Sequence, residues 1–412
     1  MQDKPSAMQN QPSPDHQHAD LIIKAGWIAP VAPETGALAD HALVVRGDTI
    51  VDLLPTPLAD QKWRADEVVE LGNHLLIPGL VNAHTHAAMN LFRGLADDLP
   101  LMTWLEQHIW PAEGQWMSEA FVRDGTRLAA AEMIRSGTTC FADMYFFPET
   151  TARVAMEAGL RAVLFSPILD FPTPMGAGPD DYLRLATEAA DNWRHEPRVT
   201  IGFGPHAPYT VSDGPLEKVL TLAEELDAPL MMHEHETAGE IHQAVETSGE
   251  RPLTRLKQLG LLNPRLLAVH MTQLLDEEIQ WLGETRTAAL LAKGVSLRAD
   301  AVPAATALRM ATLNGARALG LESRTGSLEI GKQADMIAVD LGALETQPVY
   351  DPVAQLVYAA TRDQVTHSWV AGRCLMADRR LTTLNAALIA KNAAEWQRNI
   401  APNNDRANNE SR

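Results

Sequence analysis

The sequence has few cysteines, few basic residues and no long apolar run. Its 412 residues include two cysteines, Cys140 and Cys374, far apart, which excludes a disulfide framework or a thiolate zinc site and favours a reducing cytoplasm. No stretch approaches the ~20 apolar residues of a membrane span, so we expect no contact with a membrane. The chain has 34 Lys and Arg but 53 Asp and Glu, and this excess of negative charge argues against an extended surface that binds nucleic acid.

The remaining composition is that of a folded, globular protein. Hydrophobic residues make up 46% of the chain and charged residues 21%, so a large core is available. The length exceeds that of most single domains, although α/β barrels can be as large as one unit. We therefore predict one large domain and a smaller one.

Both ends of the chain carry the alternating apolar pattern of antiparallel strands. HALVVRGDTIVDLLP places a Gly-Asp turn between two such runs, and GSLEIGKQADMIAVDL repeats this character near the other end. We predict that residues 20–74 and 325–380 form one composite β-sandwich. Residues 1–19 are predicted to be a disordered N-terminal arm, and residues 381–412 a C-terminal helix and tail.

Between those ends, apolar strand-like runs alternate with helical stretches, which is the pattern of parallel βαβ units. Residues 75–324 are therefore predicted to form a metal-dependent (β/α)₈ TIM barrel, which makes the fold class α/β. The strand candidates are residues 75–86, 138–146, 161–169, 199–204, 229–233 and 266–270.

The barrel predicted from these runs is two strands short. A closed barrel of this type needs eight strands, at about 30 residues for each βα repeat. Residues 271–303 are too few for two repeats, and they have the character of helical surface and loop. We therefore expect a segment to be missing near residues 283–286, either omitted from the written sequence or deleted from the protein.

Histidines gather at the carboxyl ends of the strand candidates, where barrel enzymes carry their chemistry. His84 and His86 are two residues apart, so on a strand their side chains point the same way. Taken alone, such a pair is equally compatible with two polar residues ending a buried strand. His233 ends another strand at the same rim, and imidazole suits zinc, which needs three or four ligands with one position open. We predict that His84, His86 and His233 bind the metal.

Catalysis by such a metal also requires a group that moves protons, because zinc lowers the pKa of a bound water to about 7. Glu236 lies three residues past His233 and could serve both the water and a ring nitrogen of the substrate, although it could also be a surface acid. His270 could orient the attacking water, or be an isolated strand-end histidine. His235 is expected to be a solvated side chain.

Four motifs in order, PGLVNAHTH, GFGPHAPYT, MMHEHET and LLAVHMTQL, resemble the amidohydrolase superfamily branch of 5′-methylthioadenosine/S-adenosylhomocysteine deaminases and chlorohydrolases. The resemblance covers nearly the whole chain. It implies one zinc ion per subunit, or iron, bound by His84, His86, His233 and an aspartate after the eighth strand. It also implies that Glu236 shuttles protons and that His270 polarises the water.

By the same matching, Glu113 in IWPAE resembles the acid that binds ribose hydroxyls, and His206 resembles a substrate-binding histidine. The resemblance implies hydrolytic deamination of an adenosine-type nucleoside by a cytoplasmic homo-oligomer. Relatives that accept S-adenosylhomocysteine carry arginines after the third strand, whereas residues 162–183 contain no Lys or Arg. We therefore expect 5′-methylthioadenosine as substrate, with 5′-methylthioinosine and ammonia as products.

The sequence departs from this branch in the interval where the strand count is short. The usual segments H-x-P-x-S-N and G-T-D-G-A-x-S-N are absent. Two alternatives therefore stay open. The chain could be another amidohydrolase, acting on guanine, a pterin or a chlorotriazine. It could also be a metal-deficient pseudoenzyme that serves as a binding protein.

Overall fold

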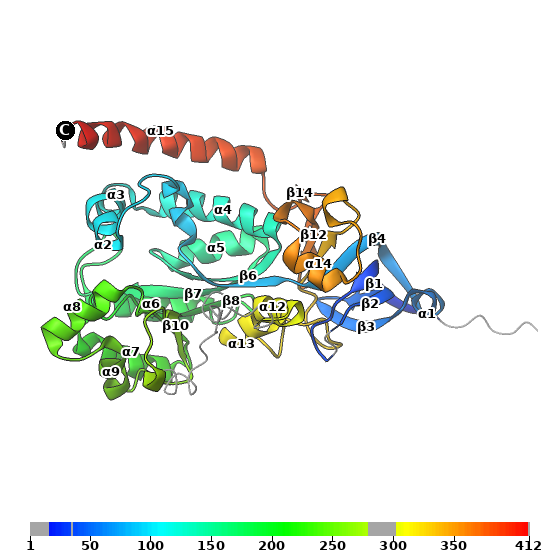
Figure 1. The fold of residues 1–412 in the computed structure, drawn as a ribbon, viewed down its shortest axis with the longest axis horizontal. Helices are drawn as coiled ribbons and strands as arrows, with labels where there is room; N and C mark the ends of the chain where they lie inside the picture. Colours follow the sequence, from blue (N-terminus) through cyan, green and yellow to red (C-terminus); the bar gives the residue numbers. More distant parts are fainter. Residues whose placement is uncertain (1–15, 34–35, 279–301, 411–412) are drawn as a thin grey trace, which may run out of the picture.

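The structure is a computed structural model that describes residues 16–33, 36–278 and 302–410. These residues form two sheets, which occupy different parts of the molecule (Figure 1). An eight-stranded mixed sheet combines both ends of the chain, and a six-stranded parallel sheet is built from its middle. Within the described ranges, no helix has both the length and the apolar character needed to cross a bilayer.

The mixed sheet joins strands from the two chain ends. Its order is β14-β13-β12-β11-β4-β1-β2-β3, and β11 pairs antiparallel with β4, so the C-terminal strands continue the N-terminal ones. Gly47 turns the chain between β2 and β3 with φ 60°, which glycine adopts without strain. The strands are β1 (Gln17–Ile28), β2 (Leu38–Arg46), β3 (Thr49–Pro55), β4 (Trp63–Pro78), β11 (Met336–Asp340), β12 (Val365–Val370), β13 (Arg373–Ala377) and β14 (Arg380–Leu381).

Two boundaries differ from those predicted. Strand β1 begins at Gln17, inside the predicted arm of residues 1–19, whose first fifteen residues lie outside the described part of the chain. The predicted strand over residues 75–86 is divided, because β4 ends at Pro78 in the mixed sheet and β5 begins at Leu80 in the parallel sheet. Gly79 lies between the two strands. A side chain cannot be accommodated there, because a Cβ atom would lie 1.9 Å from the Thr139 hydroxyl oxygen.

The parallel sheet runs in the order β10-β9-β8-β7-β6-β5. Its central strands β6 and β7 are buried at every position, as expected for parallel strands covered on both faces. After β5, each predicted strand ends within two residues of the observed one. The strands are β5 (Leu80–Thr85), β6 (Thr138–Met144), β7 (Arg161–Ile168), β8 (Val199–Pro205), β9 (Leu230–Glu234) and β10 (Leu266–His270).

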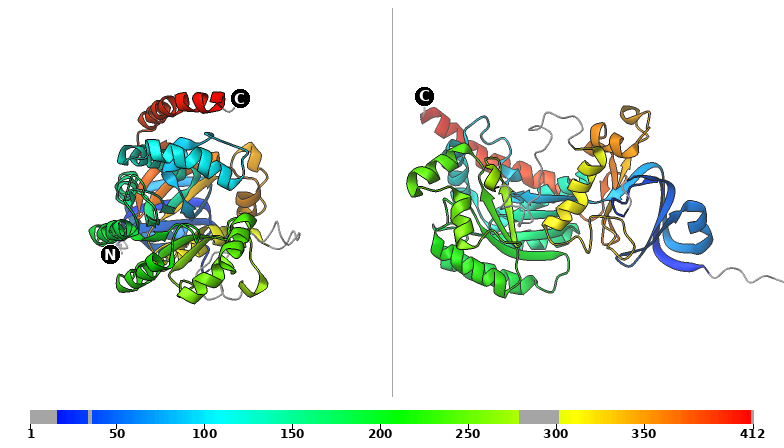
Figure 2. Two further views of the ribbon diagram at one scale, coloured as in Figure 1. Left: turned by 90° about the vertical axis from the view of Figure 1, so that its left-hand side faces the viewer. Right: turned by 60° about the horizontal axis from the view of Figure 1, so that its bottom comes forward.

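Helices cover the outside of this sheet (Figures 1 and 2). The Ser118 hydroxyl accepts a hydrogen bond from the Phe121 N–H at the start of α4, which ends at Gly137 with φ 90°. Helix α15 packs across α4 through Trp396, whose indole N–H donates to Asp124. The helices of eight or more residues are α4 (Glu119–Ser136), α5 (Pro148–Ala158), α6 (Pro179–Trp193), α7 (Asp213–Glu225), α8 (Ala238–Ser248), α9 (Pro252–Leu259) and α15 (Ala386–Glu410).

The parallel sheet is open between its first and last strands. Among the described residues, β10 pairs only with β9 and β5 only with β6. The segment predicted to be missing near residues 283–286 falls outside the described ranges. Short helices α12 (Ala304–Arg309) and α13 (Gly315–Ala318) follow, and Leu319 and Leu321 join the core that Phe165 and Met231 form inside the sheet.

A buried ion pair connects the two sheets. The Arg161 guanidinium at the start of β7 donates to both carboxylate oxygens of Asp335, at 3.0 and 3.2 Å, just before β11. The two side chains are at most 1% exposed. Asp335 also accepts the Ala371 N–H at 2.7 Å, so one carboxylate anchors the mixed sheet against the parallel sheet.

Candidate functional site

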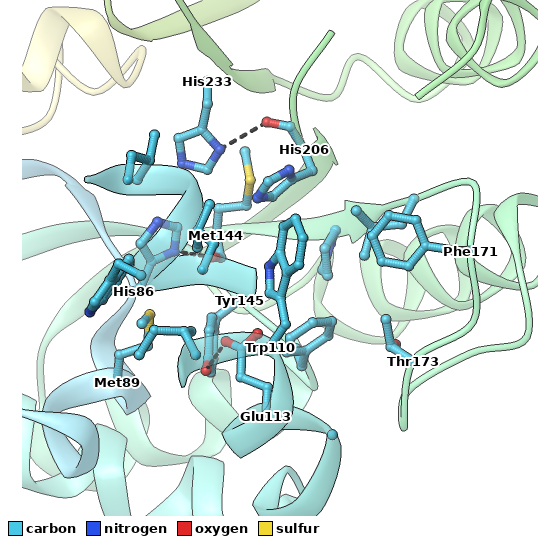
Figure 3. A pocket seen from close by; sticks show the side chains of 18 of the residues that line it. His86, Met89, Trp110, Glu113, Met144, Tyr145, Phe171, Thr173, His206 and His233 are labelled. Atoms are coloured by element: carbon cyan, nitrogen blue, oxygen red, sulfur yellow. Dashed lines mark hydrogen bonds between the residues drawn. The ribbon is translucent and has the colours of Figure 1, made fainter. Parts of the chain in front are cut away.

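Five histidines from distant parts of the chain meet at the carboxyl ends of the parallel strands. The His233 ring centroid lies within 5.3 Å of the ring centroids of four other histidines. Figure 3 shows His86, His206 and His233 grouped at the inner end of a pocket. Strand direction explains the grouping, because parallel strands all end at the same rim. The four partners are His84 in β5, His86 directly after it, His206 after β8 and His270 at the end of β10.

Two of the predicted ligand atoms face each other. His84 Nε2 and His233 Nε2 lie 3.3 Å apart. His233 Nδ1 lies 2.8 Å from the His206 carbonyl oxygen, which can only accept, so Nδ1 carries the hydrogen and Nε2 keeps a free lone pair. Among the described residues, the third histidine whose ligand atom falls within 4.8 Å of these two is His270.

His86 lies beside this group and not within it. Its ring centroid is 4.8 Å from that of His84, and its Nδ1 donates to the Met144 carbonyl oxygen at 2.6 Å. That hydrogen bond fixes the ring and leaves Nε2 available, as in metal-bound histidines whose other nitrogen is held by a backbone carbonyl. The predicted set of His84, His86 and His233 thus stays a prediction, with His270 the third member of the group found by geometry.

The cluster keeps its imidazoles neutral. Burial, reinforced by repulsion from His86, His270 and His206, lowers the pKa of His84 to about 3. Burial likewise lowers the pKa of His206 to about 4 and that of His233 well below its usual value. A metal requires neutral imidazole ligands, so these shifts prepare the site for a cation at physiological pH.

Asp143 braces the turn that carries His84 and His86. Its Oδ1 atom accepts hydrogen bonds from the Thr85 hydroxyl at 2.8 Å and the Ala87 N–H at 2.6 Å. Burial raises the pKa of Asp143 to about 6, and these two donors oppose the shift. Asp143 was not among the predicted site residues, although an acid near the end of the apolar strand TTCFADM could have indicated it.

The pocket above the histidines has a volume of about 510 Å³. All seven predicted site residues line it, which brings the predicted acids and histidines to one place. Its lining includes no lysine or arginine among the described residues, and its outer walls are apolar (Figure 3). The apolar walls include Trp104, Leu105, Trp110, Leu169, Phe171 and Pro172.

Two carboxyl groups line this pocket, those of Glu236 and Glu113. Glu236 Oε1 lies 3.5 Å from His270 Nε2, and burial raises the pKa of Glu236. Glu113, from helix α3 (Trp110–Trp116), accepts a hydrogen bond from the Tyr145 hydroxyl at 2.6 Å. Burial raises the pKa of Glu113 to about 7, although the Tyr145 hydrogen bond opposes the shift. Both groups therefore titrate above the usual glutamate range.

His206 and His235 are each held by a neighbouring hydrogen-bonding group. His206 Nδ1 lies 3.1 Å from the Thr210 hydroxyl oxygen, which holds its ring against the pocket. His235, expected to be solvated, is fully buried, and its Nε2 accepts the Leu253 N–H at 3.3 Å. That expectation was wrong because the residue after β9 turns back with φ 51° and buries its side chain under helix α9.

Comparison with known proteins assigns most of the chain to the family that its sequence motifs resemble. Residues 75–285 and 277–375 match the model of the Amidohydrolase family. The two matched pieces overlap at residues 277–285, in the interval where the sequence predicts a missing segment.

A 5-methylthioadenosine/S-adenosylhomocysteine deaminase of Saccharophagus degradans is 47% identical, with 92% of this chain and 96% of that protein covered. That alignment runs over 430 positions, more than the 412 residues of this chain, so the relative has residues without a counterpart here. The relation extends over nearly the full length of both proteins.

Solved structures share the fold. An adenosine deaminase from Xanthomonas campestris with bound zinc is 43% identical and superposes with a TM-score of 0.91, covering 93% of this chain and 99% of that one. A triazine hydrolase from Arthrobacter aurescens, 19% identical, has a TM-score of 0.83 over 91% and 99%. The predicted α/β class, a TIM-type barrel with a separate sheet built from both chain ends, is confirmed.

Proposed function

The chain belongs to the amidohydrolase family, and on that premise we propose that it is a metal-dependent hydrolase that deaminates an adenosine-type nucleoside. The observation that carries the proposal is the pocket itself, in which the histidine cluster, Glu236 and Glu113 face one cavity of about 510 Å³. The 47% identity to a protein named as a 5-methylthioadenosine/S-adenosylhomocysteine deaminase supports the same activity.

The donor set fits a divalent metal. The Nε2 atoms of His84 and His233 lie 3.3 Å apart, and the Nδ1 atom of His86 donates to a backbone carbonyl, so that its Nε2 is available. We propose these three as ligands of one zinc or iron ion, as the resemblance implies. Such an ion acts as a Lewis acid that makes water a nucleophile at neutral pH. Among the described residues, the group whose ligand atoms lie within 4.8 Å of one another is His84, His233 and His270, so the aspartate ligand that the resemblance implies is not part of it.

The protein's own groups move the protons. Glu236 accepts a proton from the attacking water and delivers it to the ring nitrogen next to C6 of the purine. The remaining proton of the added hydroxyl then passes to the amino group, which leaves as ammonia, and a carbonyl remains. Its raised pKa suits this exchange, because the group must hold a proton and release it near neutral pH. His270, 3.5 Å from Glu236, orients the water, and His206 contacts the base from the neighbouring strand end.

The substrate is proposed to be 5′-methylthioadenosine, with 5′-methylthioinosine and ammonia as products. Glu113, which lines the same pocket as Glu236, accepts the ribose hydroxyls. The described residues that line the pocket include no lysine or arginine to pair with the carboxylate of an amino-acid substituent, whereas their apolar side chains accept a thioether. A cytoplasmic location and a homo-oligomeric state remain predictions, and the free Cys140 and Cys374 are consistent with the former.

The test is a spectrophotometric panel of nucleosides and bases with metal-loaded protein. We expect release of ammonia from 5′-methylthioadenosine and adenosine, and none from guanine, pterins or chlorotriazines. Turnover of one of those three in place of adenosines would replace the proposal with that activity.

Glu236→Gln is the matched variant for this panel. We expect it to retain its metal and to lose about 100- to 10,000-fold in kcat. Protein that holds no stoichiometric metal and turns over none of the panel would be the binding protein that the sequence leaves open as an alternative.

A further inference from the structure

Tyr145 connects the two ends of the pocket. It follows strand β6 directly and is 6% exposed. Its ring centroid lies 6.0 Å from that of His86, and its hydroxyl donates to Glu113 Oε1 at 2.6 Å (Figure 3). Glu113 belongs to helix α3, outside the barrel strands, so this one side chain links the helix to the histidine cluster.

We propose that Tyr145 is a positioning residue that holds Glu113 as an oriented acceptor for two adjacent sugar hydroxyls, and thereby makes the pocket selective for ribonucleosides over dideoxynucleosides. The proposal rests on the proposed function, in which Glu113 binds the ribose. It assigns a role to a residue that neither the motifs nor the resemblance singled out.

The geometry of the carboxylate supports this role. A glutamate side chain has three rotatable bonds, and fixing it costs conformational entropy that a ligand would otherwise have to supply. The Tyr145 hydroxyl occupies Oε1, while Oε2 has no hydrogen-bond donor among the described residues. A carboxylate held at one oxygen thus presents the other to the cavity, where a ligand hydroxyl can donate to it.

The surroundings of Glu113 explain why its hydrogen bond with Tyr145 matters. Glu113 lines the pocket together with the largely apolar side chains Ile109 and Trp110, and among the described residues the Tyr145 hydroxyl is the side-chain donor to its carboxylate. Burial favours the protonated carboxyl, and the Tyr145 hydrogen bond is the effect that opposes it. A protonated Glu113 would lose much of its value as an acceptor, so Tyr145 maintains both its orientation and its ionised form.

A purely structural role would give a different result. If Tyr145 only filled space beside His86, its hydroxyl would not matter for one class of ligand more than for another. The comparison must therefore remove the hydroxyl alone and test ligands that differ only in the sugar. Tyr145→Phe makes the first change, and inosine against 2′,3′-dideoxyinosine makes the second, with neither ligand open to deamination.

The measurement is calorimetric binding of both inosines to metal-loaded protein, with kcat/KM for adenosine and 2′,3′-dideoxyadenosine beside it. In Tyr145→Phe we expect the preference for the ribonucleoside to fall about tenfold in both assays, the usual effect of losing a hydrogen bond to a charged group. Binding of the dideoxynucleoside should stay within about twofold of the parent protein.

Tyr209→Phe is the matched control, since Tyr209 lines the same pocket beside His206 and far from Glu113 along the chain. It is expected to affect both sugars alike. In a Glu113→Gln background, Tyr145→Phe should change the preference no further, because the two residues act as one unit. Should Tyr145→Phe fail to fold, Glu113→Asp withdraws the carboxylate from the same hydroxyl and should give the same selective loss.

Equal losses for both sugars, or an unchanged preference, would overturn the inference. So would a parent protein that binds the two inosines equally. Failure of the proposed function is a separate result: a protein that prefers inosine, loses that preference in Tyr145→Phe and yet deaminates no adenosine keeps the inference and rejects the deaminase assignment.

Discussion

His84 Nε2 and His233 Nε2 lie 3.3 Å apart, although 149 positions separate the two residues in the chain. The His206 carbonyl fixes the hydrogen of His233 on Nδ1, so His233 Nε2 can only accept. When the hydrogen of His84 is on Nδ1, the lone pairs of both Nε2 atoms are directed at one point, and a cation placed between them is stabilised by both in a site where burial keeps imidazoles neutral.

Removal of His233 should therefore remove the metal. Loss of a residue that only hydrogen-bonds to a metal ligand usually lowers metal affinity by about 10- to 100-fold. In His233→Ala, which removes a ligand itself, we expect a larger loss. Elemental analysis after dialysis against a metal buffer measures this. His242→Ala, which deletes an exposed histidine paired with Glu246, is the control and should keep the parent metal content. Equal metal in both variants would refute the assignment of His233.

Loss of Asp335 should destabilise the fold. Asp335→Ala leaves the buried Arg161 guanidinium without its carboxylate, and breaking such a pair costs about 3–5 kcal/mol. The free energy of unfolding from a denaturant titration gives the value. Glu188→Ala removes an exposed ion pair with Arg184 and should leave the free energy of unfolding unchanged. A change in Asp335→Ala no larger than in this control would contradict the role given to the ion pair.

Binding of ribonucleosides should strengthen as the pH rises through about 7. The raised pKa of Glu113 means that the carboxyl is protonated below that pH and ionised above it, and the ionised form is the better acceptor. Tyr145 and His86 face this wall, and burial lowers the pKa of His86, which favours its neutral form near pH 7.

Calorimetry with inosine between pH 5.5 and 8.5 is expected to show this rise, and 2′,3′-dideoxyinosine should not show it. Glu113→Gln removes the titrating group and should flatten the inosine profile. A profile that persists in Glu113→Gln would assign the titration to another group.

The pocket should prefer a neutral 5′ substituent. We expect kcat/KM for 5′-methylthioadenosine to exceed that for S-adenosylhomocysteine by at least about tenfold, because the described residues of the lining offer no basic partner to the amino-acid carboxylate. Phe171→Arg places a guanidinium in that wall and should narrow the ratio, whereas Phe171→Leu, which adds no charge, should not. Comparable values for the two substrates in the parent protein would be evidence against this reading of the pocket.

Local patterns predicted the strands well, because a buried parallel strand must be a short apolar run. β10 occupies the predicted residues 266–270, and β7 begins at the predicted Arg161. The division of residues 75–86 into β4 and β5 could not be predicted in this way, since both halves are apolar. It depends on contact between Gly79 and Thr139, which is a tertiary packing effect.

The candidate site was predictable where its residues end strands. His84, His86, His206, His233 and His270 come together because a barrel directs all its strand ends to one rim. Glu113 was found through the resemblance alone, since nothing in a helical IWPAE indicates a pocket. The role of Tyr145 depends on a contact 32 positions away, which no periodicity encodes.

The buried pair of Arg161 and Asp335 makes the two sheets depend on one another. Arg161 begins β7 in the parallel sheet, Asp335 precedes β11 in the mixed sheet, and neither side chain is more than 1% exposed. Separating the sheets would leave each charge without its counter-ion in an apolar interior, which costs several kcal/mol. The mixed sheet and the strands that carry the histidines are therefore expected to unfold as one cooperative unit.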